Sequence, residues 1–438
     1  MKRYFNIFVV AVFLISLSSC ESEIDSSNET DNDVLNKEDI ILPAGNFISF
    51  YTDIETRASL LTEQYITQPF GVFGYQYDFN NTWNGQRAMA KPNVFWNLNN
   101  GGGKLPLKVS YANGSYNYRA DGPQDNTMAS NGQVNWTSNR YAFWAYYPYE
   151  GYDPSYFSVS GMEIEGAPYI TYQVDRTTTQ NMYDVMTGGI SQITAASSGN
   201  TVTFTMQHRL SAVDVSISNA YEHEYTKGKI NYTEDVDIII EELQLQFNKL
   251  KYTHAKIFLE KDKNIPALNT VLTPASTEAN MSATYLLVGS NSDIASSVTI
   301  EPTATEKTNL TAKNGATMTF IPQETTDLSV TAIVKYHMEG KDTQGRIPHL
   351  RVNEDGEPID KDNNKTDDST KFVYDGVSDN ETTGAKSYIL VSKTTDFNQP
   401  LVEGTRYYIV LNFTSEAVSI NIITAETWDE RTIDYEFK

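Results

Sequence analysis

The sequence is poor in cysteine, in histidine and in basic residues. One of its 438 residues is cysteine and five are histidine, while 33 Lys and Arg stand against 56 Asp and Glu, for a formal net charge of −23. A single cysteine excludes a disulfide framework and a cysteine-rich metal site. An acidic chain without a basic stripe repels a phosphate backbone, so nucleic acid is not an expected partner.

The common catalytic and cofactor motifs are also missing. The sequence contains no Gly-x-Ser-x-Gly, no phosphate-binding loop and no dinucleotide glycine pattern. The five histidines are scattered, and the pair His223-Glu224 is not followed by a second histidine at the zinc-protease spacing. The sequence therefore predicts neither an enzyme nor a bound cofactor.

After residue 20 no segment has 18 consecutive apolar residues, so a later membrane-spanning helix is not expected. At the start, Lys2 and Arg3 precede an apolar run over 4–17 that is short of the ~20 residues that cross a bilayer. We interpret 1–19 as a signal peptide. Leu17-Ser18-Ser19-Cys20 resembles the bacterial lipobox, which implies that Cys20 is acylated and holds the chain on a membrane. The alternative is an ordinary buried thiol near a cleavage site.

Residues 20–45 combine the lipidated cysteine with a predicted disordered leash. Between 21 and 40 lie eight acids, one base and no aromatic residue, a composition that cannot bury enough surface to fold. Acids directly behind the cysteine also resemble the surface-export signal of Bacteroidetes lipoproteins. A plain solvated spacer is the alternative.

From residue 46 onward the pattern is typical of an all-β protein. Val202–Met206, Ala212–Ile217, Leu328–Tyr336 and Tyr407–Phe413 each alternate apolar and polar residues, which predicts sheets with one buried face. The polar segment 219–235 separates two strand-dense halves. We therefore predict an N-terminal β-sandwich domain over 46–225 and a C-terminal one over 226–438.

A second polar segment, 351–371, is interpreted as a long exposed loop. Its run Asp360–Asn364 resembles the opening of a calcium loop, but Lys365 stands at the sixth position in place of Gly and Lys371 at the twelfth in place of Glu. The pattern favours a solvated loop, and calcium binding at 351–371 is left open.

The densest aromatic segment has nine aromatic residues between Tyr141 and Phe157. Aromatic faces can stack on sugars, so one interpretation is a glycan-binding platform. The alternation along 141–147 favours the other interpretation, a core strand whose rings pack between sheets.

Several motifs together resemble a known family. The aromatic strand ends in Ala-Tyr-Tyr-Pro-Tyr (145–149), and Asp184-Val185-Met186 precedes the block Phe204–Val213, with the pattern F-x-x-x-H-x-L-S-x-V. A late strand pair ends in Trp428, and Phe47–Tyr51 is followed by Glu55-Thr56-Arg57-Ala58. In this order the motifs resemble the fimbrillins of Bacteroidales, in their Mfa-like, fimbrillin-like branch.

The resemblance implies two transthyretin-like β-sandwiches in tandem, exported as a lipoprotein and assembled at the outer membrane into type V pili that act in adhesion. It also implies that an arginine-specific protease cuts between Arg57 and Ala58. The segment with Phe47, Ile48, Phe50 and Tyr51 would then be a plug. Its removal leaves an apolar groove that a strand of another pilin subunit fills.

Two questions stay open at the level of sequence. The stalk, tip or anchor role is not decided by the motifs, and neither is the adhesion target, a host or bacterial surface glycan or protein. The alternative to a fimbrial subunit is a non-polymerising outer-membrane surface lipoprotein that binds glycans through its aromatic residues.

Overall fold

The structure is a computed structural model. It describes residues 47–54, 66–77, 95–124, 128–151, 153–162, 168–195, 200–220, 222–227, 230–259, 271–273, 281–290, 294–301, 308–310, 317–323, 327–340, 372–374, 389–414 and 418–424. Every secondary-structure element named in these ranges is a β-strand, so the all-β prediction is confirmed. The finer prediction of two transthyretin-like sandwiches in tandem stays a prediction.

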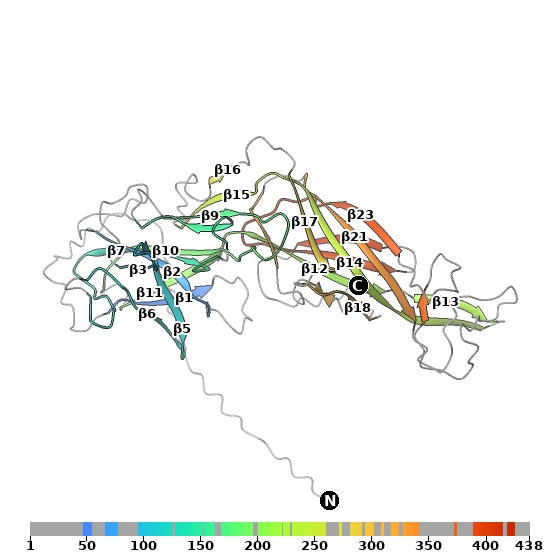
Figure 1. Cartoon of the computed structure of the whole chain (residues 1–438), viewed down its shortest axis with the longest axis horizontal. Coiled ribbons are helices and arrows are strands. Elements are labelled where there is room, and N and C mark those ends of the chain that lie inside the picture. Colours follow the sequence, from blue (N-terminus) through green and yellow to red (C-terminus); the bar gives the residue numbers. More distant parts are fainter. Residues whose placement is uncertain are drawn as a thin grey trace, which may run out of the picture. The chain divides into compact units, whose positions relative to one another are not determined.

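Most strands before β12 belong to one seven-stranded sheet, in which the strand order is β1-β11-β10-β7-β2-β5-β6 (Figure 1). Its strands are β1 (Ser49–Ile54), β2 (Phe70–Tyr77), β5 (Leu107–Ala112), β6 (Ser115–Tyr118), β7 (Arg140–Tyr147), β10 (Met186–Ile193) and β11 (Thr201–His208). β11 shows the expected period of two, because Val202, Phe204 and Met206 are buried between exposed threonines. One face of this strand therefore belongs to a core.

The sheet has a core on each face, and β7 contributes to both. Tyr141, Phe143 and Ala145 belong to the smaller cluster, with Phe50, Phe70 and Phe204 among its other members. Ala142, Trp144 and Tyr146 belong to the larger cluster, which continues into strands late in the chain. The core interpretation of the aromatic strand is thus confirmed, since rings on both of its faces are buried.

Two further sheets enclose the larger cluster. One has the order β19-β12-β24-β25 with β20 beside β12, and the other has β13-β14-β21-β22 with β17 and β18 on β14 and β23 on β21. Their strands are β12 (Ser211–Ala220), β13 (Glu222–Lys227), β14 (Ile230–Leu250), β17 (Met281–Val288), β18 (Val298–Ile300), β19 (Thr308–Asn309), β20 (Met318–Phe320), β21 (Ser329–Gly340), β22 (Phe372–Tyr374), β23 (Ile389–Asp396), β24 (Arg406–Thr414) and β25 (Val418–Thr424).

Strand pairing crosses the predicted boundary at 225/226 in both directions. β12 precedes the boundary but pairs in parallel with β24, while β15 (His254–Phe258) follows it but pairs with β9 (Tyr169–Gln173). That four-stranded sheet also contains β8 (Phe157–Val159) and β16 (Val271–Thr273), and a separate pair joins β3 (Asn97–Leu98) to β4 (Lys104–Leu105). A division into two domains stays a prediction, and the pairings mean that two such domains would share strands.

The polar segment 219–235, expected to separate the halves, is built mainly as a hairpin. β13 and the start of β14 pair from Glu222↔Asp235 to Lys227↔Ile230. β14 then continues to Leu250 and pairs with β21, β17 and β18. A charged composition is typical of hairpins as well as of linkers. Composition alone therefore did not show that this segment forms paired strands.

Candidate functional site

The first strand, β1, is an edge strand of the seven-stranded sheet. It pairs in parallel with β11, from Ser49↔Thr201 to Ile54↔Met206. The backbone N–H of Ser49 points to the β11 side and donates to the Asn200 carbonyl over 3.0 Å, whereas that of Ile48, just before the strand, points to the opposite side and donates to the Val134 carbonyl over 2.9 Å. The strand is thus fixed along one side by an ordinary β-ladder.

Alternate side chains of this segment point into the smaller core. Ile48 is 1% exposed, Phe50 4% and Thr52 0%, whereas Tyr51 is 43% exposed. The Phe50 ring has four aromatic neighbours at centroid distances between 5.4 and 5.9 Å, namely Phe95, Tyr118, Phe143 and Phe204. Phe50 therefore fills the centre of an aromatic cage that the rest of the chain provides.

The other side of β1 is held by tyrosines of β6, the strand at the opposite edge of the same sheet. The hydroxyl of Tyr118 donates to the carbonyl of Ile48 over 2.8 Å and accepts the backbone N–H of Val134 over 3.1 Å. Burial raises the pKa of Tyr118 to about 12, so its hydroxyl stays a donor at physiological pH. The two edges of the curled sheet are thereby joined through side chains.

A second tyrosine closes a cyclic hydrogen-bond network around Thr52. The Ile66 N–H donates to Thr52 Oγ1 over 3.1 Å, and the Tyr116 hydroxyl donates to the Ile66 carbonyl over 2.9 Å. Since the single proton of Tyr116 is used there, the Thr52 hydroxyl donates to the Tyr116 oxygen. Each of these polar groups therefore has a hydrogen-bond partner, and the bond between Ile66 and Thr52 is buried.

The predicted plug residues thus have different environments. Ile48 and Phe50 face the core, Phe47 is partly buried and bridges to Asn135, and Tyr51 lies on the outer side against Tyr116. Cys20, Arg57 and Ala58 lie outside the described residues, as do 351–371 and Trp428.

The sequence analysis missed Thr52, which directly follows the predicted segment Phe47–Tyr51, and the two tyrosines that hold the strand. The alternation of 48, 50 and 52 was the available signal for Thr52. For Tyr116 and Tyr118 the spacing along β6 gave no such signal, because their partners are distant in sequence.

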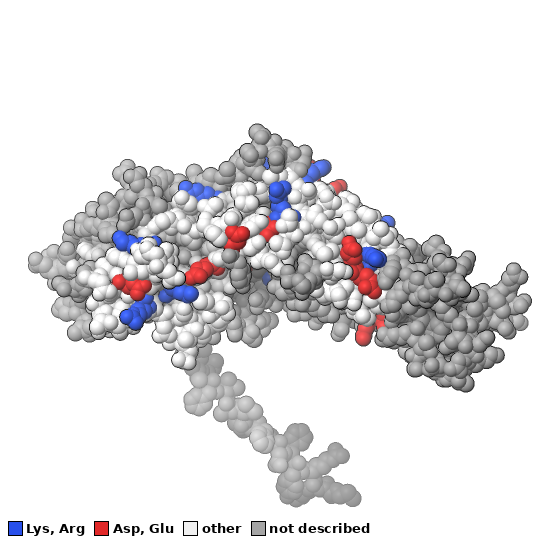
Figure 2. All heavy atoms as spheres, viewed as in Figure 1, with Lys and Arg blue, Asp and Glu red and all other residues white. Residues whose placement is uncertain are grey.

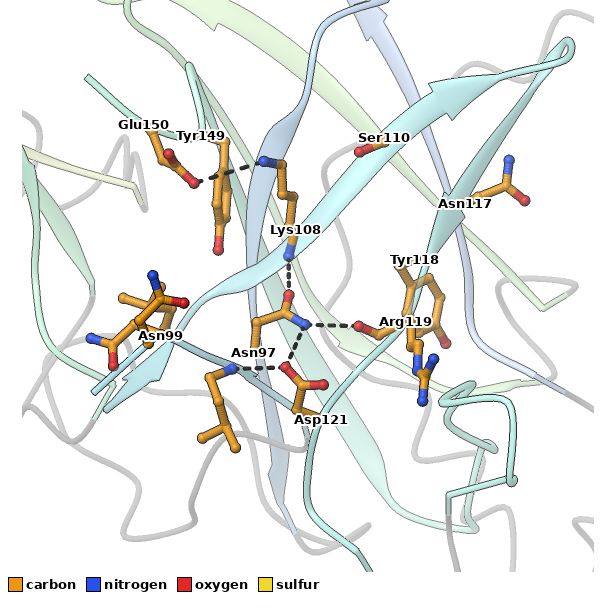
Figure 3. A pocket seen from close by; sticks show the side chains of 13 residues that line it. Asn97, Asn99, Lys108, Ser110, Asn117, Tyr118, Arg119, Asp121, Tyr149 and Glu150 are labelled. Carbon is orange, nitrogen blue, oxygen red and sulfur yellow. Dashed lines mark hydrogen bonds and ion pairs between the residues drawn. The ribbon is translucent and has the colours of Figure 1, made fainter. Parts of the chain in front are cut away.

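A polar cleft of about 790 Å³ lies over β3, β5 and β6 (Figure 3). At its centre the Asn97 amide donates to the Arg119 carbonyl and to Asp121, while its oxygen accepts the Lys108 N–H over 2.7 Å. Lys108 lies over the Tyr149 ring and 3.7 Å from Glu150. The rim carries the exposed side chains of Asn99, Asn100, Asn117 and Arg119. Such amide and guanidinium groups suit a hydroxyl-rich or anionic ligand.

The motif residues Asp184 and 204–213 lie where β11 of the seven-stranded sheet connects to β12 of the next sheet. His208 Nδ1 lies 2.7 Å from Asp184 Oδ1, so the structure brings these two motif residues together. The buried Arg209 guanidinium donates to Thr187 over 2.8 Å, and its Nε lies 2.8 Å from Glu403. Burial lowers the pKa of Arg209, and the charge of Glu403 opposes that shift. These contacts hold the connection between β11 and β12 against β10 and against Glu403.

Among the described residues, neither the distribution of charge on the face shown nor the placement of possible metal ligands identifies another site. In Figure 2 basic and acidic side chains of the described residues are interspersed on the face shown, without a large patch of one sign. Within the described ranges no group of three His, Cys, Asp or Glu is placed to hold a metal ion. A helix with the length and apolar character needed to cross a membrane is also absent from the part of the chain that the structure describes.

No family model and no curated protein sequence matches the chain. Its fold is similar to solved structures of fimbrial and candidate cell adhesion proteins. A fimbrial protein from Bacteroides vulgatus has 17% identity and a TM-score of 0.48, with 87% of this chain and 99% of that chain covered. A candidate cell adhesion protein from Bacteroides ovatus has 14% identity and a TM-score of 0.42, with coverage of 88% and 98%.

The fimbrial anchor protein Mfa2 from Porphyromonas gingivalis is a more distant match, with 7% identity and a TM-score of 0.27 over 87% of this chain and 98% of that one. Identities and TM-scores this low carry no argument about what the chain does.

Proposed function

We propose that this protein is a subunit of a cell-surface fimbria, exported as a lipoprotein on Cys20, cut after Arg57, and assembled by β-strand exchange at the position of β1. The observation that carries the proposal is the place of β1 between β11 and the tyrosines of β6. It is the segment that closes the smaller core, and it is the first strand of the described residues.

The physical consequences of removing β1 support this reading. Loss of the strand leaves β11 with unpaired backbone groups along one edge and exposes the cage around Phe50. Large aromatic side chains each bury 150–250 Å², at about 25 cal/mol per Å². An open cage is therefore unstable by several kcal/mol, so the cut strand stays in place until another strand displaces it. The vacated edge is suited to β-augmentation by a strand of a second subunit.

The lipid and the protease enter the proposal through the sequence motifs. Acyl chains on Cys20 hold the uncut subunit at the outer membrane until an arginine-specific protease cuts after Arg57. Release of the folded part from its lipid follows when another strand displaces the cut β1, because β1 stays joined to Cys20. In this proposal export, membrane attachment and strand exchange follow one another as steps of a single assembly route.

The test of cleavage is N-terminal sequencing of surface-assembled material from the unaltered chain and from Arg57→Ala. The unaltered subunit is expected to begin at Ala58 and to form SDS-resistant ladders, whereas Arg57→Ala remains a folded, lipid-anchored monomer. Arg176→Ala is the matched control, because Arg176 is an exposed arginine of the described part and its removal leaves the predicted cut site intact. If assembled subunits still begin at Cys20, the proposal that β1 is a plug removed by cleavage is wrong.

The test of the anchor is Cys20→Ala. We expect this variant to leave the detergent phase on phase partitioning, since the only acylation site of the chain is lost. Unchanged partitioning contradicts lipidation at Cys20 without touching the strand-exchange argument.

A glycan-binding surface lipoprotein that never polymerises is the second candidate. The cleft of Figure 3 favours it, rather than the aromatic strand, whose rings are largely buried. A glycan array separates the two candidates: binding that disappears in Arg119→Ala, by a chain that stays monomeric after cutting, supports the second.

A further inference from the structure

The site that β1 occupies has three inward positions with different chemistry. The position of Ile48 is apolar, that of Phe50 is an aromatic cage, and that of Thr52 is polar. Because side chains alternate along a strand, a strand that slips by one residue presents none of its proper side chains to these positions. Binding at this site therefore depends on both the sequence and the register of the strand that occupies it.

The contact at the first position does not depend on the occupant's side chain. Tyr118 binds the main-chain carbonyl of Ile48 over 2.8 Å, and every residue offers such a carbonyl. Its contribution is to anchor any strand that enters. Discrimination between strands falls to the second and third positions.

The third position is the selective one. When Thr52 leaves, the Ile66 N–H loses its acceptor and the Tyr116 oxygen loses its donor, both in a place where Thr52 itself is 0% exposed. A serine or threonine restores both hydrogen bonds. A valine has nearly the same shape as threonine but leaves a buried donor unsatisfied, which costs about 1–3 kcal/mol.

We propose that the site vacated by β1 selects an incoming strand with an aromatic residue at the Phe50 position and a serine or threonine two residues further on, opposite Tyr116 and Ile66. This inference rests on the proposed function, because it assumes that the site accepts a second strand. It goes further by naming the sequence pattern of the partner strand.

The experiment uses the full chain, cut after Arg57, and a labelled synthetic peptide with the sequence of residues 46–54. Exchange of the resident strand for the peptide is followed by native mass spectrometry and fluorescence anisotropy. We expect a peptide with Thr52→Ser to bind within about threefold of the parent peptide. A peptide with Thr52→Val is expected to bind at least tenfold more weakly, the equivalent of one unsatisfied donor.

Variants of the protein locate the effect. Tyr116→Phe removes the hydroxyl that faces Thr52, so the preference for Thr52 over Val in the peptide is expected to shrink several-fold. Tyr169→Phe is the matched control, because this tyrosine lies on β9 and its ring packs against Phe258. The peptide series alone decides the question if Tyr116→Phe fails to fold.

The outcomes separate the two proposals. If the parent peptide does not exchange with the resident strand, the site does not accept a second strand, and both the proposed function and this inference fail. If the parent peptide and the Thr52→Val peptide bind equally well, the selective third position is wrong while strand exchange stands.

Discussion

The ring of Phe50 stacks on the ring of Phe204, with their centroids 5.9 Å apart and their planes inclined by 14°. The two residues belong to paired strands, but Phe50 lies before the predicted cut and Phe204 after it. Half of this contact therefore comes from a segment that is proposed to leave. Stability before processing and stability after assembly depend on different residues at the same place.

Replacing Phe50 tests this difference. We expect Phe50→Ala to lower the free energy of unfolding of the uncut protein by about 3–5 kcal/mol, because a fully buried ring leaves a cavity. Tyr51→Ala, its neighbour on the exposed side, is the control and is expected to cost below about 1 kcal/mol. Urea unfolding followed by tryptophan fluorescence measures both.

After cutting and strand exchange the same substitution is expected to have no effect on the assembled subunit, because residue 50 is no longer present. An assembled Phe50→Ala subunit as unstable as the uncut one indicates that β1 was never replaced.

The strand β7 gives a second prediction. Phe143 is 0% exposed and packs on Phe50, Phe95 and Tyr141. Phe143→Ala is expected to destabilise the protein by about 3–5 kcal/mol through the cavity it creates. A change below about 1 kcal/mol, or a stable variant that loses sugar binding, supports the platform interpretation of this strand.

Period two was sufficient to predict strands with one buried face. Val202, Phe204 and Met206 of β11 alternate with exposed threonines. In β24 the buried Tyr407 and Ile409 lie on either side of the partly buried Tyr408, although Val410 is buried as well. The same pattern predicted less about β12, whose polar residues Asp214 and Ser216 are buried as well. A strand covered on both faces loses the contrast that alternation depends on.

The closure of the smaller core could not be predicted from local sequence. Thr52 and Tyr116 are 64 residues apart, and Ile48 and Tyr118 are 70 apart. Contacts of this kind depend on which strands form the two edges of the sheet and how far it curls. Neither property leaves a periodic signal in the strands themselves, so the candidate site was predicted only as far as its apolar residues.

Close packing around Gly74 gives a third prediction. A Cβ atom on Gly74 would lie 2.8 Å from ring atoms of both Phe143 and Phe95, and both rings are fully buried. We expect Gly74→Ala to cost about 1–3 kcal/mol in the free energy of unfolding, because the cage must expand to admit a methyl group.

Gly101→Ala is the matched control for this packing effect. Its nearest contact would be 3.5 Å, from the side-chain oxygen of Asn99, and it lies in an exposed turn. Thermal unfolding of the two variants is the measurement. Equal melting temperatures contradict tight packing of the cage around Gly74.

The last prediction concerns Asp175, which organises the turn between β9 and β10. Its Oδ1 accepts hydrogen bonds from the N–H and hydroxyl of Thr177 and from the N–H of Thr178, and its Oδ2 accepts one from Asn181. Burial acts to raise the pKa of this carboxyl, but the hydrogen bonds outweigh it and hold the pKa below the ordinary value of 3.8.

A carboxyl with a lowered pKa in the folded state binds fewer protons than in the unfolded chain, so stability rises with pH across the interval between the two pKa values. The contribution of Asp175 is therefore fully present above about pH 4 and is lost as the pH falls through the folded-state pKa. In Asp175→Asn this part of the pH dependence is expected to disappear. Urea unfolding of both proteins at several pH values between about 2 and 6 measures the difference, and parallel curves would show that the turn does not favour the charged form.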